Sequence, residues 1–125
     1  MWKIYYLEKI TAINMDPITL HDFSKIEIRV GKVIEATNKE GSDKLLRLIV
    51  DFGSFGQRLI FTGVRTYGFT ADDFQNRQFL FVVNLEPKKM MDEMSHGMIL
   101  AVDDEKAEKP VFVSAESLPV GSKVR

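Results

Sequence analysis

Short runs of β-branched and aromatic residues, separated by Gly, Asn and Asp, dominate this 125-residue chain. In the first run Ile26, Ile28 and Val30 alternate with Glu27 and Arg29. Little of the chain repeats every three or four residues as a helix does. Six runs are predicted to be strands: residues 26–36, 45–52, 58–62, 79–85, 98–102 and 111–113. The pattern therefore predicts a mainly β protein.

Gly and Thr residues predict where the strands bend, where they are connected and where a helix begins. Gly31 interrupts the first one, which predicts a bulge or a sharp bend there. Residues 53–56 form a connection of hairpin length between the second and third runs. One helix start is visible at Thr70, followed by Asp72 and Asp73, which suit the positive end of a helix of about two turns.

Five or six strands with one short helix between the third and fourth is the order of an OB-fold, a five-stranded Greek-key barrel. A chain of 125 residues suits one compact domain. Side chains fill the interior of so small a barrel, so a ligand would bind one outer face and its loops.

Global composition excludes disorder but names no partner. The net charge is −1, yet residues 25–89 hold eleven Lys or Arg against eight Asp or Glu, which allows a local cationic face. The chain has no cysteine, which excludes disulfides, thiolate zinc sites and iron–sulfur clusters. His21 and His96 stand in unrelated contexts, so we expect neither an enzyme nor a metal or other cofactor.

Residues 84–98 carry the strongest functional pattern. Lys88 and Lys89 follow Pro87 after an apolar run, and Ser95 precedes Gly97 at the entry to the next run. We interpret this stretch as a strand, a loop with a basic and hydroxyl-bearing mouth, and a second strand. Two adjacent lysines can neutralise adjacent phosphates, although a solvated turn is the alternative.

Six motifs, in order, resemble the tRNA-binding domain family, which includes the C-terminal extension of many methionyl-tRNA synthetases, free-standing tRNA-binding proteins, the EMAP II-type cytokine domain and the CsaA-type chaperones. The motifs occupy residues 28–33, 42–45, 50–53, 62–64, 84–89 and 95–98. The resemblance covers roughly residues 19–125. It implies an OB-fold with added C-terminal strands, usually paired as a homodimer, that recognises folded tRNA by shape. Glu8 and Lys9 interrupt the apolar core that a signal peptide needs, so we expect the protein in the cytoplasm.

The resemblance also suggests site residues. Lys32 and Lys44 match positions at which the family tends to be basic, and Ser95 and Met98 match its RNA-contacting face. Met98 offers an apolar surface to a base or sugar, and Asn84 is able to read a base edge or a 2′-hydroxyl. The RNA-binding residues predicted are Lys32, Lys44, Asn84, Lys88, Lys89, Ser95 and Met98.

Each of these side chains has a structural alternative. Ser95 satisfies a turn and Met98 packs inside the barrel in that interpretation, while Asn84 bonds to its own turn. Alternation places Arg29 on the face of the first strand opposite Ile28 and Val30. There it is able to contact RNA or to pair with a neighbouring carboxylate, and we expect the structural role. Three aromatic residues in expected loops are able to stack unpaired bases or to pack: Phe55, Tyr67 and Phe69.

The chain departs from the family beside the lysines. Glu86 replaces a commonly basic residue, and Asp92 and Glu93 add further negative charge, which predicts weaker or more salt-sensitive RNA binding. Four methionines keep a second hypothesis open, a CsaA-like dimeric chaperone for unfolded or exported polypeptides. They are Met90, Met91, Met94 and Met98.

The two ends of the chain are expected to differ from the barrel. Residues 1–18 are an N-terminal extension, and our hypothesis is that Met15 is the native initiator; alternatively, residues 2–7 cover the dimer or barrel edge. Residues 19–125 form the tRNA-binding domain, and its tail, residues 110–121, is predicted to build a two-fold interface. No run is long and apolar enough to span a membrane. An aminoacyl-tRNA synthetase is a possible partner.

Overall fold

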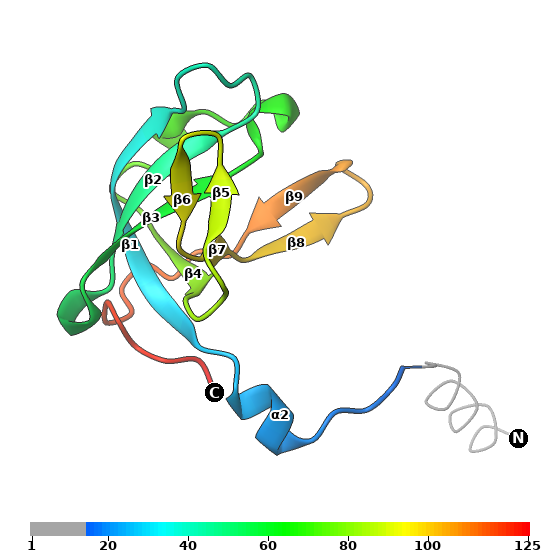
Figure 1. Ribbon diagram of the computed structural model, residues 1–125. Helices are drawn as coiled ribbons and strands as arrows, with labels where there is room; N and C mark the ends of the chain where they lie inside the picture. The colour runs from blue at the N-terminus through cyan, green and yellow to red at the C-terminus, as the bar shows by residue number, and fades with distance from the viewer. Residues whose placement is uncertain (1–14) are drawn as a thin grey trace, which may run out of the picture.

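A five-stranded antiparallel sheet curls into a nearly closed barrel in the computed structural model, which describes residues 15–125 (Figure 1). The strand order is β3-β2-β1-β4-β7. Its strands are β1 (Ile28–Asn38), β2 (Leu46–Asp51), β3 (Gln57–Thr62), β4 (Gln78–Val82) and β7 (Met98–Ile99). The prediction of an OB-fold barrel is confirmed.

Two small hairpins stand outside the barrel (Figure 1). The first pairs β5 (Lys88–Met90) with β6 (Glu93–Ser95), and the second pairs β8 (Ala101–Asp104) with β9 (Lys109–Phe112). Helical structure is limited to α2 (Leu20–Ser24) and three 3-10 turns, η1 (Gly53–Phe55), η2 (Arg65–Tyr67) and η3 (Ala71–Asp73), among residues 15–125.

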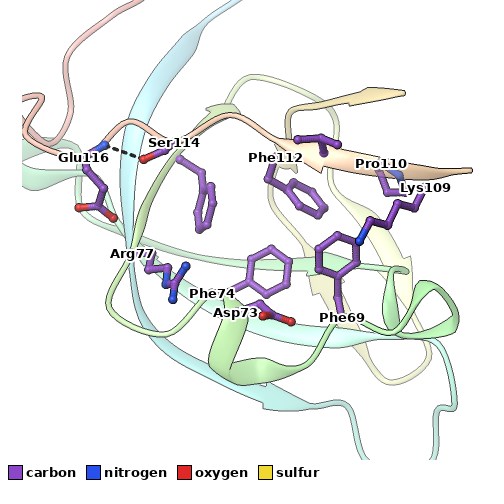
Figure 2. A pocket seen from close by; sticks show the side chains of 11 residues that line it. Phe69, Asp73, Phe74, Arg77, Lys109, Pro110, Phe112, Ser114 and Glu116 are labelled. Carbon is purple, nitrogen blue, oxygen red and sulfur yellow. Dashed lines mark hydrogen bonds between the residues drawn. The ribbon is translucent and has the colours of Figure 1, made fainter. Parts of the chain in front are cut away.

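Alternation along the strands builds the core. Leu46, Leu48 and Val50 of β2 are fully buried, while the residues between them are partly exposed. At one end of the barrel Phe69, Phe74 and Phe112 pack with ring centroids 5.1–6.0 Å apart (Figure 2). Edge and tilted arrangements of this kind stabilise aromatic clusters beyond their burial of area.

The barrel closes between β3 and the segment that joins β6 to β7. The N–H of His96 donates to the carbonyl of Leu59 at 2.8 Å. The guanidinium of Arg58 donates to the carbonyls of Val83 and His96 at 2.5 and 3.2 Å. These bonds replace a regular ladder across the gap.

Gly31 has a packing role; of the bulge or sharp bend predicted there, the bulge was wrong and the bend stays a prediction. Gly31 pairs regularly with Phe79, and the register shift lies between Val33 and Glu35. A Cβ on Gly31 would lie 2.6 Å from side-chain atoms of both Val50 and Phe52. The absence of a side chain at Gly31 therefore allows the core side chains of Val50 and Phe52 to pack against the β1 backbone.

The helical predictions were partly wrong. The segment after Thr70 forms one 3-10 turn instead of two helical turns, and the N–H of Thr70 donates to the carboxylate of Asp73 at 2.8 Å. It stops because Asn76 turns the chain with φ 61° and donates its N–H to the carbonyl of Val33. The unpredicted α2 is capped by Thr19, whose hydroxyl accepts from the N–H of Asp22 at 3.0 Å.

The chain after β4 is also divided differently. The run over residues 98–102 changes partner at Leu100, so that Met98–Ile99 pairs with β4 and Ala101–Asp104 pairs with β9. The tail then returns along the barrel: Gly121 donates to Val30, and Val30 donates to Ser122. The expected C-terminal extension is present.

The expectations for the first fourteen residues lie outside the described residues.

Candidate nucleic-acid interface

Residues 88–95 form a β-hairpin, so the loop predicted there was wrong. Lys88 pairs with Ser95, Lys89 with Met94 and Met90 with Glu93. Met91 adopts φ 63°, which allows a two-residue turn between the strands. Strands of three residues are too short to show a period in the sequence, which is why the hairpin was missed.

The hairpin stands over a groove of about 520 Å³ against the barrel. Its apolar lining includes Phe61, Leu85, Met90 and Met98, and Met98 is 47% exposed. Lys88 supplies the cation and Glu86 the carboxylate among the described residues that line the groove. This combination suits a ligand with an apolar surface and a negative charge.

Lys88 and Lys89 serve different faces. Both side chains are exposed, but neighbouring residues of a strand point to opposite sides, and only Lys88 is found in the lining of the groove among the described residues. Lys88 therefore faces the groove, and Lys89 faces the other side of the hairpin. That the pair neutralises adjacent phosphates stays a prediction.

Ser95 fastens the hairpin to the barrel. It is 4% exposed, and its hydroxyl accepts the N–H of Phe61 at 3.1 Å while it donates to the carbonyl of Gly97 at 3.2 Å. These bonds satisfy the donor and one acceptor position of the hydroxyl. The structure thus supports the structural alternative for Ser95, and its contact with RNA stays a prediction.

Asn84 connects two distant segments. Its Oδ1 accepts the N–H of Glu27 at 2.8 Å, and its Nδ2 donates to the carbonyl of Lys25 at 2.6 Å. The side chain thus joins the chain after β4 to the residues before β1, instead of its own turn. Both ends of the Asn84 amide therefore already have partners within the protein. Base or ribose recognition by Asn84 remains a prediction.

Lys32 and Lys44 lie at opposite ends of the β1–β2 ladder. Lys32 pairs with Asp51 at one end, while Lys44 precedes the other end, where Leu46 pairs with Asn38. β2 is six residues long, so its two ends lie about 17 Å apart at the usual rise of a strand. Lys44 lies at the end of the ladder near the turn of the β5–β6 hairpin, where Asp92 contacts Lys39. Lys32 lies at the opposite end.

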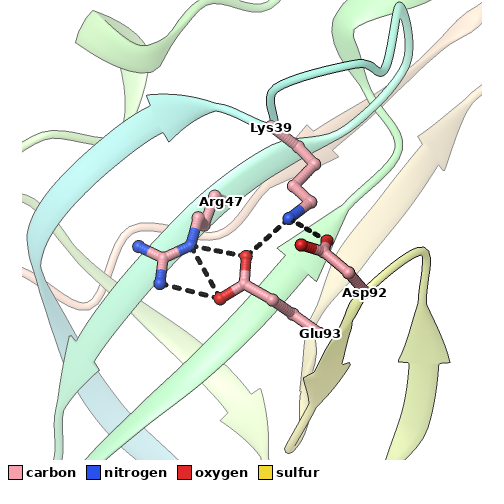
Figure 3. Close-up of polar contacts among 4 residues, drawn as sticks. All are labelled: Lys39, Arg47, Asp92 and Glu93. Atoms are coloured by element: carbon pink, nitrogen blue, oxygen red, sulfur yellow. Dashed lines mark hydrogen bonds and ion pairs between the residues drawn. The ribbon is translucent and has the colours of Figure 1, made fainter.

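Four charges anchor the turn of the hairpin (Figure 3). The Nζ of Lys39, a residue 7% exposed, lies 2.5 Å from Asp92 and 2.6 Å from Glu93. Arg47 donates to both carboxylate oxygens of Glu93, with its Nη2 at 2.9 Å. The sequence analysis did not predict this network. The signal present in the sequence was two cations in one segment and two adjacent carboxylates in the other.

The network changes the charges available to a ligand. Hydrogen bonds from Arg47 and then Lys39 lower the pKa of Glu93 to about 2, and Lys39 lowers the pKa of Asp92. Both carboxylates are therefore ionised but paired with cations. Asp92 and Glu93 thus add less negative charge beside Lys88 than the sequence suggested, because Lys39 and Arg47 neutralise them. Glu86, in contrast, lines the groove together with Lys88. The expected weak RNA binding stays a prediction.

The other cations and aromatic residues divide into separate sites. The guanidinium of Arg29 binds Glu27 and the carbonyl of Gly121 and covers the ring of Phe55 at 3.9 Å, which confirms its structural role. Tyr67 lies in a hollow lined by Asp103, Asp104 and Glu105. Phe69 belongs to the aromatic end of the barrel. The three aromatic residues therefore do not form one stacking surface.

Two further observations concern residues 15–125. No group of three or more His, Cys, Asp or Glu side chains is arranged to hold a metal ion there. No helix in this part of the chain is long and apolar enough to cross a membrane.

A five-stranded, nearly closed antiparallel barrel with a short helical turn between β3 and β4 defines the class of OB-fold domains. The family model described as "Putative tRNA binding domain" matches residues 28–123. The chain belongs to this tRNA-binding domain family. The resemblance inferred from the six motifs is confirmed.

The chain is similar to a small part of larger proteins. It is 40% identical over 108 residues to the methionine–tRNA ligase of Polaromonas sp. strain JS666 and 38% identical over 102 residues to that of Burkholderia vietnamiensis strain G4. These matches cover 85% and 80% of this chain. The chain spans only 15% and 14% of the two ligases.

Solved structures match it over most of its length. A MetRS-related protein from Pyrococcus horikoshii has a TM-score of 0.81 at 34% identity, covering 89% of this chain and 100% of that chain. The CsaA chaperone from Picrophilus torridus has a TM-score of 0.77 at 25% identity, covering 87% and 100%. The C-terminal domain of Plasmodium vivax p43 has a TM-score of 0.75 at 26% identity, covering 85% and 63%.

Proposed function

We propose that residues 19–125 bind folded tRNA by its shape and its phosphates, in the cytoplasm, either as a free-standing protein or as an accessory to an aminoacyl-tRNA synthetase. The observation that carries the proposal is the position of Lys88, which faces an apolar groove in a domain of the tRNA-binding family. Similarity to a MetRS-related protein and to methionine–tRNA ligases supports a synthetase as the partner.

The groove suits RNA chemically. Lys88 displaces counterions from a phosphate, while exposed Met98 packs against a ribose or base edge. Phosphate and sugar contacts carry no base code, so recognition depends on the path of the backbone. Such a site selects folded tRNA by the spacing of its contacts.

A homodimer is part of the proposal. Val102 and Val111 are cross-strand neighbours on the β8–β9 hairpin and are 58% and 43% exposed. Val113 and Leu118 extend this apolar surface along the tail with 44% and 51% exposure. Exposed apolar residues clustered on an added hairpin suit a self-complementary interface, which would double the number of RNA contacts.

A chaperone for unfolded polypeptides is the second candidate. Met91, Met94 and Met98 are 51%, 40% and 47% exposed on or beside the hairpin, and flexible thioethers adapt to varied apolar ligands. The similarity to CsaA chaperones supports it. Since Lys88 lies in the groove, an acidic or phosphate-bearing ligand is favoured over an apolar chain.

Salt titration of binding to folded tRNA tests the proposal, with Lys88→Gln and Lys89→Gln as matched variants on neighbouring positions. Loss of one phosphate contact is expected to reduce the slope of log affinity against log salt by about 1 for Lys88→Gln. A smaller change is expected for Lys89→Gln, whose side chain points away from the groove. Both variants should unfold at the wild-type urea concentration.

An unfolded peptide and an unstructured RNA serve as competing ligands. Tighter binding to folded tRNA than to either supports the proposal. Equal effects of the two lysine variants, or no effect of Lys88→Gln, would remove the groove as the site. Salt-independent preference for the peptide would support the chaperone candidate instead.

A further inference from the structure

A second cavity lies at the aromatic end of the barrel and shares no lining residue with the groove among those described. Figure 2 shows the rings of Phe69, Phe74 and Phe112 gathered inside it. Phe69 and Phe112 are partly exposed, whereas Phe74 is buried. Its volume of about 500 Å³ lies within the range of small-molecule sites.

Two cations flank the rings. In Figure 2 Lys109 lies beside Phe69 at one end of the cavity, and Arg77 lies at the other end, near Glu116. The Nζ of Lys109 is 5.6 Å from the centre of the Phe69 ring. Within residues 15–125, neither cation forms an ion pair with a carboxylate.

The carboxylates of the cavity already have backbone partners. Asp73 accepts the N–H of Thr70 at 2.8 Å, and Glu116 accepts the N–H of Gln78 at 2.8 Å. These contacts tie the two carboxylates to the chain. Each carboxylate keeps its charge, and between them the cavity offers an aromatic floor with a cation at each end.

We infer that this cavity binds an unpaired nucleotide, with its base against Phe69 and Phe112 and its flanking phosphates beside Lys109 and Arg77. Each base of a single strand has a phosphate on either side, which matches the order cation, ring, cation. Aromatic stacking combined with backbone cations is the usual basis of single-strand binding. The inference extends the proposed RNA-binding function to a second surface, but its test does not depend on tRNA binding.

Nuclear magnetic resonance titration of the full ¹⁵N-labelled chain tests this site with three probes: hexaadenylate, adenosine 3′,5′-bisphosphate and adenosine. The first two are expected to shift the amide signals of residues around Phe69, Arg77 and Phe112. Adenosine, which has no phosphate, is expected to bind more weakly. Equal binding of adenosine, or shifts confined to the groove around Lys88, would overturn the inference.

Variants test the two cations and the ring. Lys109→Gln and Arg77→Gln change exposed side chains and are each expected to weaken hexaadenylate binding about two- to fivefold. Phe112→Leu keeps an apolar side chain but removes a stacking surface, with about a tenfold loss expected. Lys88→Gln is the control and should leave these shifts unchanged. No effect of either cation variant would overturn the inference even if Phe112→Leu failed to fold.

The probes also identify the source of the nucleotide. Hexaadenylate binding more tightly than the bisphosphate supports an RNA strand, and equal affinity supports a free nucleotide in the same site. An apolar peptide that shifts these signals when neither phosphate-bearing probe does would replace the nucleotide with a polypeptide and overturn the inference. If tRNA does not bind but these shifts are still observed, the proposed tRNA-binding function of the groove is wrong, while the inference on the aromatic cavity stands.

Discussion

The ammonium of Lys39 lies 2.6 Å from the carboxylate of Glu93, 54 positions further along the chain. This ion pair joins the end of β1 to the β5–β6 hairpin, and Arg47 of β2 binds the same carboxylate. The groove beside Lys88 depends on where this hairpin stands. The ionic network is therefore a positioning device for the proposed RNA-binding surface.

Glu93→Gln should destabilise the protein at neutral pH, because the uncharged amide loses its ionic bonds to Arg47 and Lys39. The pKa of Glu93 is lowered from 4.5 to about 2 in the folded protein. A lowered pKa stabilises the fold above the unfolded value, and that contribution disappears as pH falls from about 4.5 to 2. The stability difference between wild type and variant should shrink over this window. Urea unfolding at several pH values measures it.

Glu86→Gln is the matched control, because Glu86 is exposed and forms no ion pair within the described part of the chain. Its stability relative to wild type should vary little over the same pH window. A Glu93→Gln variant with the pH profile of the Glu86→Gln control would show that the network does not stabilise the hairpin.

Gly31→Ala should destabilise the barrel by about 1–3 kcal/mol, the usual cost of overpacking a core. The added Cβ would lie 2.6 Å from Val50 and Phe52 and 2.8 Å from Phe81. Gly63→Ala is the control, because its nearest contact would be Leu45 at 3.9 Å. That variant should stay within about 0.5 kcal/mol of wild type. Urea unfolding of both variants decides between a packing role and a dispensable glycine.

The longer strands were predictable from the sequence. The mostly apolar run over residues 45–52, which ends at Gly53, placed β2 (Leu46–Asp51) within one residue at each end. The start of the turn at Thr70 was predictable for a local reason, since Thr70 donates its N–H to the carboxylate of Asp73 three residues further on. Such features depend on neighbours in the chain.

Features built by distant residues were not predictable. The need for glycine at position 31 arises because Val50, Phe52 and Phe81 converge on it from two other parts of the chain. Lys39 meets Asp92 only because the hairpin folds over the barrel. The opposite directions of Lys88 and Lys89 follow from the strand pairing that a three-residue run does not reveal.

Ser95→Ala should destabilise the protein by about 1–3 kcal/mol, because the buried N–H of Phe61 would lose its acceptor. Ser54→Ala, in the exposed η1 turn, is expected to stay within about 0.5 kcal/mol of wild type. Urea unfolding measures both. If Ser95→Ala weakens tRNA binding with no loss of stability, Ser95 acts as a contact to RNA instead of a structural bond.

Val111→Lys should convert the proposed homodimer to a monomer, because charge would enter an apolar surface shared with Val102. Light scattering of wild type is expected to give twice the chain mass of 14.3 kDa, and the variant to give that mass once. Met94→Lys is the matched control, since Met94 is 40% exposed against 43% for Val111 but lies on the β5–β6 hairpin. A wild-type monomer at micromolar concentration would reject the dimer. A dimer that survives Val111→Lys but not Met94→Lys would move the interface from the β8–β9 hairpin to the hairpin beside the groove.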